Sequence, residues 1–176
     1  GLPFVDGAIS GPPPIVRPGA RIYLSGPRAA EVAALPWRHV HPIPLAGPVG
    51  RASAVKMCTA SVLKGLDGLY AQAMRAAARY GVLDEFVADL RTAGIDHVGK
   101  VAVAATKAHR YVPEMREIAT AQRAAGLTPA LFTAFAELYA DIATSRLGAA
   151  DPETVDRGMA PDDVVAGITP SGRAAG

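Results

Sequence analysis

The segment Gly47-Pro-Val-Gly50-Arg-Ala-Ser-Ala-Val-Lys56-Met-Cys-Thr-Ala60 decides the fold, because a glycine-rich turn there opens into a long helix. No proline follows before Tyr80, and apolar residues recur densely. This pattern predicts one long, largely buried helix over residues 50–80, ended by Gly81. Lys56 within it is expected to be semi-buried in a polar cleft. A buried lysine can exchange a proton, whereas an arginine stays charged.

The composition excludes several classes of protein. The 176 residues are 50% hydrophobic and 19% charged, with a formal net charge of +2. They contain neither the clustered basic residues of a nucleic-acid surface nor a run of about 18 apolar residues that could span a membrane. The single cysteine, Cys58, fits a reducing compartment and is expected in the core. We expect a cytoplasmic protein without a secretion signal, a nucleic-acid partner or a membrane partner.

The pattern of the first 45 residues is typical of the last part of an α/β domain, not of its beginning. Strands are expected over residues 4–10, 21–26 and 39–45, with a helix over residues 28–35 between the last two. Three prolines at 12–14 end the first strand, and further prolines make the third strand an edge strand. Three strands bury too little surface to stand alone, so more strands are expected from elsewhere.

The remainder is expected to be helical, with helices over residues 83–93, 96–123 and 129–147. The second of these is one helix, or two broken near Pro113. Gly65 and Gly68, three positions apart in the long helix, admit a close helix neighbour. The predicted fold class is an α+β fragment followed by an all-α domain. The predicted domains are residues 1–45, 46–148 and a flexible tail, 149–176, with a short turn of helix around residues 162–166.

Other short motifs give only weak evidence for a function. Ser53-Ala-Val-Lys56 fits the S-x-x-K pattern of serine acyl-transferases, but the accompanying SDN and KTG triplets are absent. His39 and His41 share one face of a strand, a spacing that can bind a metal ion, yet no third ligand is evident. We expect surface histidines and no metal. The sequence contains no G-x-G-x-x-G or Walker motif, so it holds no phosphate-binding turn.

Two segments together resemble a known family. Asp6-Gly-Ala-Ile-Ser10-Gly11 resembles the substrate-binding D-x-P-V-S-G segment of the β-hydroxyacid dehydrogenases, which include the 6-phosphogluconate dehydrogenases. Gly47-x-x-Gly50-x-Ala52-x-x-x-Lys56 is similar to their G-x-x-G-x-G-x-x-x-K helix start, with alanine for the third glycine. The stretches 52–58, 64–66 and 110–115 resemble the DUF1932 branch, which has a phosphogluconate dehydrogenase-like C-terminal domain.

The resemblance implies a fold and a chemistry. Residues 1–45 would be the C-terminal end of a Rossmann domain whose N-terminal half, with the G-x-G-x-x-G turn, lies upstream. Such enzymes oxidise a hydroxyl-bearing small acid with NAD or NADP. Lys56 would be the general acid/base, while Ser10 and Gly11 would bind the substrate carboxylate. The helical domain would form a homodimer.

Two departures from the family pattern concern the site. The family's asparagine, one turn after the lysine, falls on Ala60, and Ser53 or Thr59 would replace it in binding substrate. A lysine near the nicotinamide falls on Pro113, which leaves two candidate cofactor contacts, Arg110 and Glu114.

Two rival hypotheses stay open beside the dehydrogenase. The first is a non-catalytic helical dimerisation remnant of such an enzyme, and an in-frame G-x-G-x-x-G segment upstream of Gly1 would count against it. The second is a hydrolase that uses Ser53 and Lys56. The 176-residue chain alone is expected to be inactive.

Overall fold

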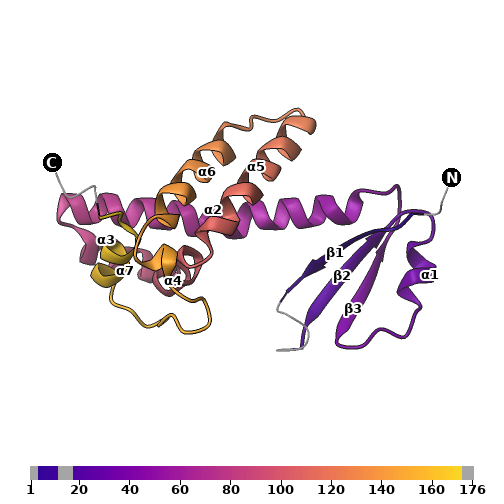
Figure 1. The fold of residues 1–176 in the computed structure, drawn as a ribbon, viewed down its shortest axis with the longest axis horizontal. Helices are drawn as coiled ribbons and strands as arrows, with labels where there is room; N and C mark the ends of the chain where they lie inside the picture. The colour runs from indigo at the N-terminus through magenta and orange to yellow at the C-terminus, as the bar shows by residue number, and fades with distance from the viewer. Residues whose placement is uncertain (1–3, 12–17, 172–176) are drawn as a thin grey trace. The chain divides into compact units, whose positions relative to one another are not determined.

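The computed structural model describes residues 4–11 and 18–171 and divides into two compact units, Gly1–Ala60 and Ser61–Gly176. Figure 1 shows the elements of both. The predicted succession of three strands and then helices is confirmed, and the class is mixed α+β. The prolines at 12–14 and residues 172–176 of the predicted tail lie outside the described residues.

The first unit contains a three-stranded sheet in the order β1-β2-β3 (Figure 1). Its strands are β1 (Asp6–Ser10), antiparallel to β2 (Ala20–Ser25), which is parallel to β3 (Val40–Leu45). The short helix α1 (Ala29–Ala33) connects the two parallel strands. Prolines at 42 and 44 remove backbone donors from β3, as suits its edge position, so the predicted edge strand is confirmed.

Helix α2 (Arg51–Tyr80) begins and ends where the sequence predicts. At its C-terminus the N–H of Val82 donates to the carbonyl of Ala77 at 2.9 Å, and Gly81 has a positive φ of 72°. This is the glycine-terminated helix end expected from the sequence. At about 1.5 Å per residue, the 30 residues extend over about 45 Å.

The prediction that α2 is largely buried is wrong for one of its faces. Met74 is fully buried, but the large apolar side chains at four positions are exposed by 45–60%: Val62, Leu63, Leu66 and Leu69. Cys58, predicted in the core, is also exposed. The density of apolar residues does not tell which faces of so long a helix the chain itself covers.

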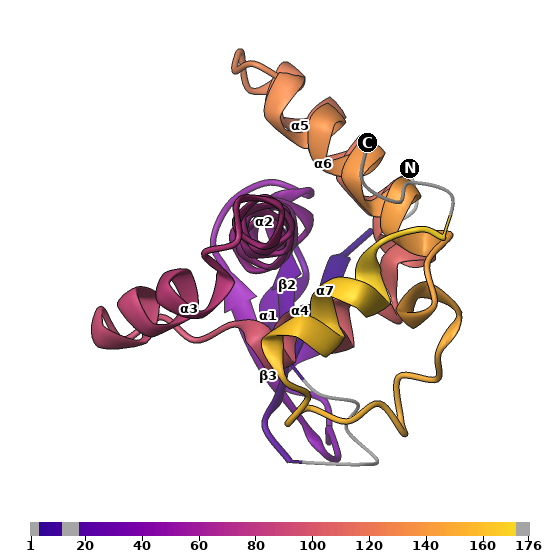
Figure 2. The same cartoon turned by 90° about the vertical axis from the view of Figure 1, so that its left-hand side faces the viewer.

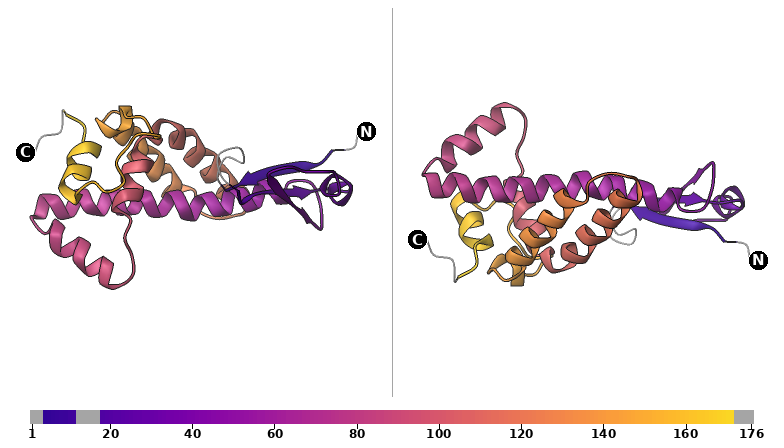
Figure 3. Two further views of the ribbon diagram at one scale, coloured as in Figure 1. Left: turned by 90° about the horizontal axis from the view of Figure 1, so that it is seen from below. Right: turned by 90° about the horizontal axis from the view of Figure 1, so that it is seen from above.

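The second unit consists of the rest of α2 and the helices that follow it. They are α3 (Leu83–Thr92), α4 (Val98–Ala105), α5 (Ala108–Ala124), α6 (Ala130–Ala143), η1 (Leu147–Ala149) and α7 (Pro161–Ile168). Helices α5 and α6 form an antiparallel hairpin (Figure 3). Gly65 and Gly68 of α2 admit Phe135 of α6, since a Cβ at Gly68 would lie 3.0 Å from the Phe135 ring. The predicted close helix neighbour is therefore confirmed.

The sequence misplaced one helix break. The segment expected over residues 96–123 is two helices, but the break falls at Thr106–Lys107 instead of Pro113. The hydroxyl of Thr106 donates to the carbonyl of Val103 at 2.8 Å, and the N–H of Lys107 donates to Ala104, so α4 closes on itself there. Pro113 lies inside α5.

The tail expected to be flexible contains a packed helix. Residues 161–168 form α7, which lies against α4 (Figure 2). Val164 and Ile168 are fully buried. Pro161 at the start of α7 suits a first helical turn, and Asp162 and Asp163 suit its positive end. The short helical turn predicted here is real and longer than expected.

Candidate functional site

In the first unit, one carboxylate joins strand β1 to the start of α2. Asp6 Oδ2 accepts hydrogen bonds from the N–H of Gly50 at 3.1 Å, the N–H of Ser53 at 3.0 Å and the hydroxyl of Ser25 at 3.0 Å. Asp6 Oδ1 accepts from the hydroxyl of Ser53 at 2.6 Å. The first N–H groups of a helix have no partner within it, so Asp6 acts as a cap supplied from another element.

Ser25 extends this cap from strand β2. Its hydroxyl oxygen accepts from the N–H of Ala52 at 3.0 Å while its proton goes to Asp6. Ser25 and Ala52 are both fully buried. The Ser53 hydroxyl, helped by these other donors, lowers the pKa of Asp6 against the opposing effect of desolvation. The Asp6 side chain is therefore held as a carboxylate at the positive end of α2.

The cap makes a testable prediction. Asp6→Asn should lower the free energy of unfolding by about 1–2 kcal/mol at neutral pH, the usual value of a helix cap. The pKa of Asp6 is lower in the folded state than in the unfolded state, so its contribution is complete above the unfolded pKa of about 3.9 and is lost as pH falls through the folded pKa. Urea unfolding across the acid range should therefore be less pH-dependent in the variant.

Asp89→Asn is the matched control, because Asp89 is exposed on α3 and its side chain makes no hydrogen bond or ion pair with any of the described residues. It should leave both the stability and its acid dependence unchanged. Equal effects of the two substitutions would show that Asp6 does not cap α2 in solution.

The substrate-side residues predicted from the sequence all belong to the first unit. Ser10 is the last residue of β1, and Gly11 follows it with a positive φ of 109°. Lys56 lies one turn after Ser53 on α2 but is exposed, so the expectation of a semi-buried lysine is wrong for this chain.

The two proposed replacements for the family asparagine differ. The Ser53 hydroxyl is already engaged, since it donates to Asp6. Thr59 is exposed on the next turn, and its side chain makes no hydrogen bond within the described part of the chain. Thr59 is therefore the freer of the two for a ligand.

The predicted cofactor contacts belong to the second unit. Glu114 of α5 forms an ion pair with Lys64 of α2, and the Lys64 ammonium lies 4.7 Å from the centre of the Tyr111 ring. The Tyr139 hydroxyl donates to the Lys64 carbonyl at 2.6 Å, and burial raises the pKa of Tyr139. Glu114 thus has an internal partner, whereas Arg110 is exposed on α5.

The sequence did not indicate a second polar pair in this unit. His97 Nδ1 lies 3.2 Å from Asp67 Oδ1, and its ring stacks on Tyr70 with 5.7 Å between centroids. Burial raises the pKa of Asp67, with His97 acting in the opposite direction. Because the two residues are 30 positions apart, no local pattern pairs them.

Two searches found nothing in the parts that the structure describes. Residues 4–11 and 18–171 contain no group of three or more His, Cys, Asp or Glu side chains that could hold a metal ion. Over the same residues, no helix combines the length and the apolar character needed to cross a membrane.

Comparisons with known proteins agree with the fold. Residues 77–142 match the family described as "Domain of unknown function (DUF1932)". One similar solved structure is the conserved protein MTH1747 of unknown function, described as similar to 3-hydroxyacid dehydrogenases. It has 28% sequence identity and a TM-score of 0.68, and the match covers 85% of this chain and 59% of that one.

A second similar structure is a conserved hypothetical protein from Sinorhizobium meliloti 1021, with 26% identity and a TM-score of 0.72 over 94% of this chain and 57% of that one. No curated protein matches the chain. The chain thus spans less than three fifths of each of these two solved structures. Residues 77–142 are thus similar to DUF1932, and most of the chain shares its fold with a protein described as similar to 3-hydroxyacid dehydrogenases.

Proposed function

We propose that this chain is the C-terminal part of an NAD(P)-dependent oxidoreductase that oxidises a hydroxyl-bearing small acid, or catalyses the reverse. The observation that carries the proposal is the Asp6 cap. Asp6 is the first residue of the segment that resembles the family's substrate-binding motif. It accepts hydrogen bonds from Gly50 and Ser53 at the start of α2, the helix that contains Lys56. Segments 44 and 47 residues apart in sequence therefore form one local structure.

The substrate side of the reaction is assigned to residues of the first unit. Ser10 and the backbone of Gly11 would bind the substrate carboxylate. Lys56 would accept the proton of the hydroxyl group as its carbon is oxidised, and its ammonium form would then stabilise the carbonyl oxygen. Its exposure leaves Lys56 accessible to a small acid.

The cofactor side does not fit the residues of this chain. The sequence has no phosphate-binding turn, and Glu114, one of its two predicted contacts, is paired with Lys64. In enzymes of this type the nicotinamide accepts the hydride. We propose that the dinucleotide is held by a Rossmann half outside these residues, and we assign it no contact here. The choice between NAD and NADP and the cytoplasmic location stay predictions.

Turnover by the full-length protein tests the proposal. A panel of small β-hydroxy acids should be incubated with the protein and either NAD or NADP, and nicotinamide reduction followed by absorbance. Reduction with at least one acid is expected. Binding of NAD(P)H without turnover of any acid would reject the hydroxy-acid chemistry, and failure to bind either dinucleotide would favour the non-catalytic remnant.

The exposed apolar face of α2 supports a homodimer, which we propose as the state of the helical unit. This face, made of Val62, Leu63, Leu66 and Leu69, continues into a groove of about 670 Å³ that Leu131 and Phe135 of α6 also line.

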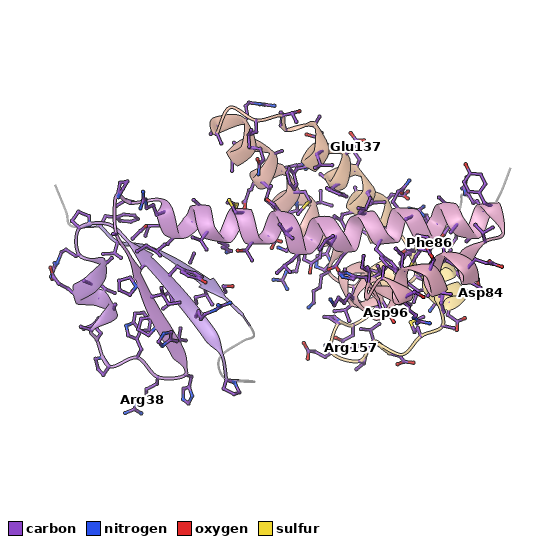
Figure 4. All side chains as sticks on the ribbon, turned by 180° about the vertical axis from the view of Figure 1, so that it is seen from behind. Arg38, Asp84, Phe86, Asp96, Glu137 and Arg157 are labelled. Atoms are coloured by element: carbon purple, nitrogen blue, oxygen red, sulfur yellow. The ribbon has the colours of Figure 1, made fainter. Side chains whose placement is uncertain are left out.

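The lining of the groove carries charges of both signs. It includes a cation, Arg79, and an anion, Glu137, which Figure 4 shows on α6. A two-fold interface brings a patch against its own copy, so a patch with both charges can pair with itself.

Introducing a charge into this face tests the dimer. Leu66→Lys should weaken self-association by about tenfold or more, because it places a cation inside an apolar interface. Light scattering across a concentration series measures the effect. Leu127→Lys, on the exposed turn between α5 and α6, is the matched control and should leave the mass unchanged. A monomeric parent chain, or equal masses for all three proteins, would contradict a dimer through this face.

A further inference from the structure

A pocket of about 550 Å³ opens on the second unit, between the start of α4 and the loop that leads to α7. Its volume is within the range of small-molecule sites, roughly 300–1,000 Å³. None of the residues predicted for the dehydrogenase site lines it. The pocket is therefore a separate candidate site, and its occupant does not depend on the proposed function.

Both acidic side chains in the pocket wall already have partners. Asp96 accepts a hydrogen bond from Arg91 Nε at 2.9 Å and one from the N–H of Val98 at 3.3 Å. Asp67 lies 3.2 Å from His97 Nδ1. The Arg91 guanidinium offsets the negative charge of Asp96, while Asp67 has the His97 ring beside it.

Two further cations line the wall. Lys100 on α4 and Arg157 on the loop before α7 form no ion pair within the described part of the chain, although the charge of Lys100 acts to lower the pKa of Asp67. Figure 4 shows Arg157 on that loop, and it also shows Asp96, which comes just before the start of α4. The pocket therefore has an excess of positive charge.

The backbone at Arg157 is held close to α4. A Cβ at Gly99 would overlap the carbonyl oxygen of Arg157, so only glycine permits this close approach of the loop to α4. On the other side, the N–H of Gly158 donates to Asp156 Oδ1 at 2.7 Å and forms a tight turn. An arginine whose backbone is already ordered loses less entropy when it binds an anion.

The rest of the wall is largely apolar. It includes Val98, Val103 and Ala104 of α4, together with Met159 and the Tyr111 ring. Such a surface contacts the hydrocarbon part of a ligand, while the two cations contact a charged head.

We propose that this pocket binds a small organic anion, with its carboxylate or phosphate between Lys100 and Arg157 and its apolar part against Val103 and Met159. A guanidinium binds either head group in a bidentate manner, and the ammonium adds a point charge. The ligand is therefore an apolar acid or an apolar phosphate ester.

The test uses the isotopically labelled chain and three probes of one length: hexanoate, hexyl phosphate and hexanol. Backbone amide signals of Gly99, Lys100 and Gly158 should shift in a saturable manner with an anionic probe and not with hexanol. Tighter binding of hexanoate would identify a carboxylate ligand, and tighter binding of hexyl phosphate a phosphate ester. Lys100→Gln and Arg157→Gln should each weaken binding by about tenfold or more.

Arg116→Gln is the control, because Arg116 is exposed on α5 and does not line the pocket. This substitution removes one positive charge, as each of the two pocket substitutions does. It should bind the anions as the parent chain does. The proposal is overturned if the three amide signals do not shift, if hexanol shifts them equally, or if Arg116→Gln weakens binding as much as the pocket variants.

Discussion

Under the proposed function, replacing Lys56 with arginine in the full-length protein is expected to lower kcat by about 10²-fold or more. Arginine keeps the positive charge and the approximate length of the side chain. It stays protonated at every working pH, so it cannot accept the hydroxyl proton of the substrate. Electrostatic attraction of the substrate carboxylate would survive the substitution, so KM should change much less than kcat. Steady-state kinetics on the best substrate of the hydroxy-acid panel measures both constants.

Lys107→Arg provides the comparison, because it makes the same chemical change at the residue before α5, outside the first unit. Its kinetics should match those of the parent enzyme. Near-normal turnover by the Lys56→Arg enzyme would show that another group handles the proton, even if the family assignment holds.

The backbone around Lys56 was predictable from sequence because its signals are local. The glycines before α2 and Gly81 after it define the ends of the helix, and the observed range, Arg51–Tyr80, agrees with the prediction to one residue. Proline positions likewise identified β3 as an edge strand. Each of these features depends on conformational preferences of a few neighbouring residues.

The environment of Lys56 was not predictable by the same means. Whether a helical residue is buried depends on which other elements cover it, and the apolar residues of α2 surround the helix too densely to indicate one face. Lys56 was therefore expected to be semi-buried and Cys58 to lie in the core, and both are exposed. The same limit applies to the apolar face at residues 62–69.

The polar contacts of the candidate site depend on distant residues. Asp6 was identified through its motif, but its role as a cap could not be inferred, because its partners lie 44 and 47 positions further along the chain. One indirect signal was present. Helix α2 has glycine where a capping side chain usually stands, so its first N–H groups needed a hydrogen-bond acceptor from another part of the chain. The pairs Lys64–Glu114 and Asp67–His97 carried no comparable signal.

Replacing Ile168 with alanine is expected to lower the free energy of unfolding by about 2–5 kcal/mol, the usual range for removing a large aliphatic side chain from a core. Ile168 is fully buried at the end of α7, which packs against α4, α3 and η1. Alanine at this position would leave a cavity, because the neighbouring helices are themselves held by other contacts. The measurement is urea unfolding followed by circular dichroism.

Ile95→Ala removes the same atoms from a residue that is 44% exposed and should change stability by about 0.5 kcal/mol or less. The difference between the two variants isolates the contribution of burial from that of side-chain chemistry. Composition alone describes residues 149–176 as a flexible tail rich in Pro, Gly, Ala and Asp. Equal, small effects of both substitutions would favour that description over a docked α7, because a side chain that is not packed in solution cannot leave a cavity when it is shortened.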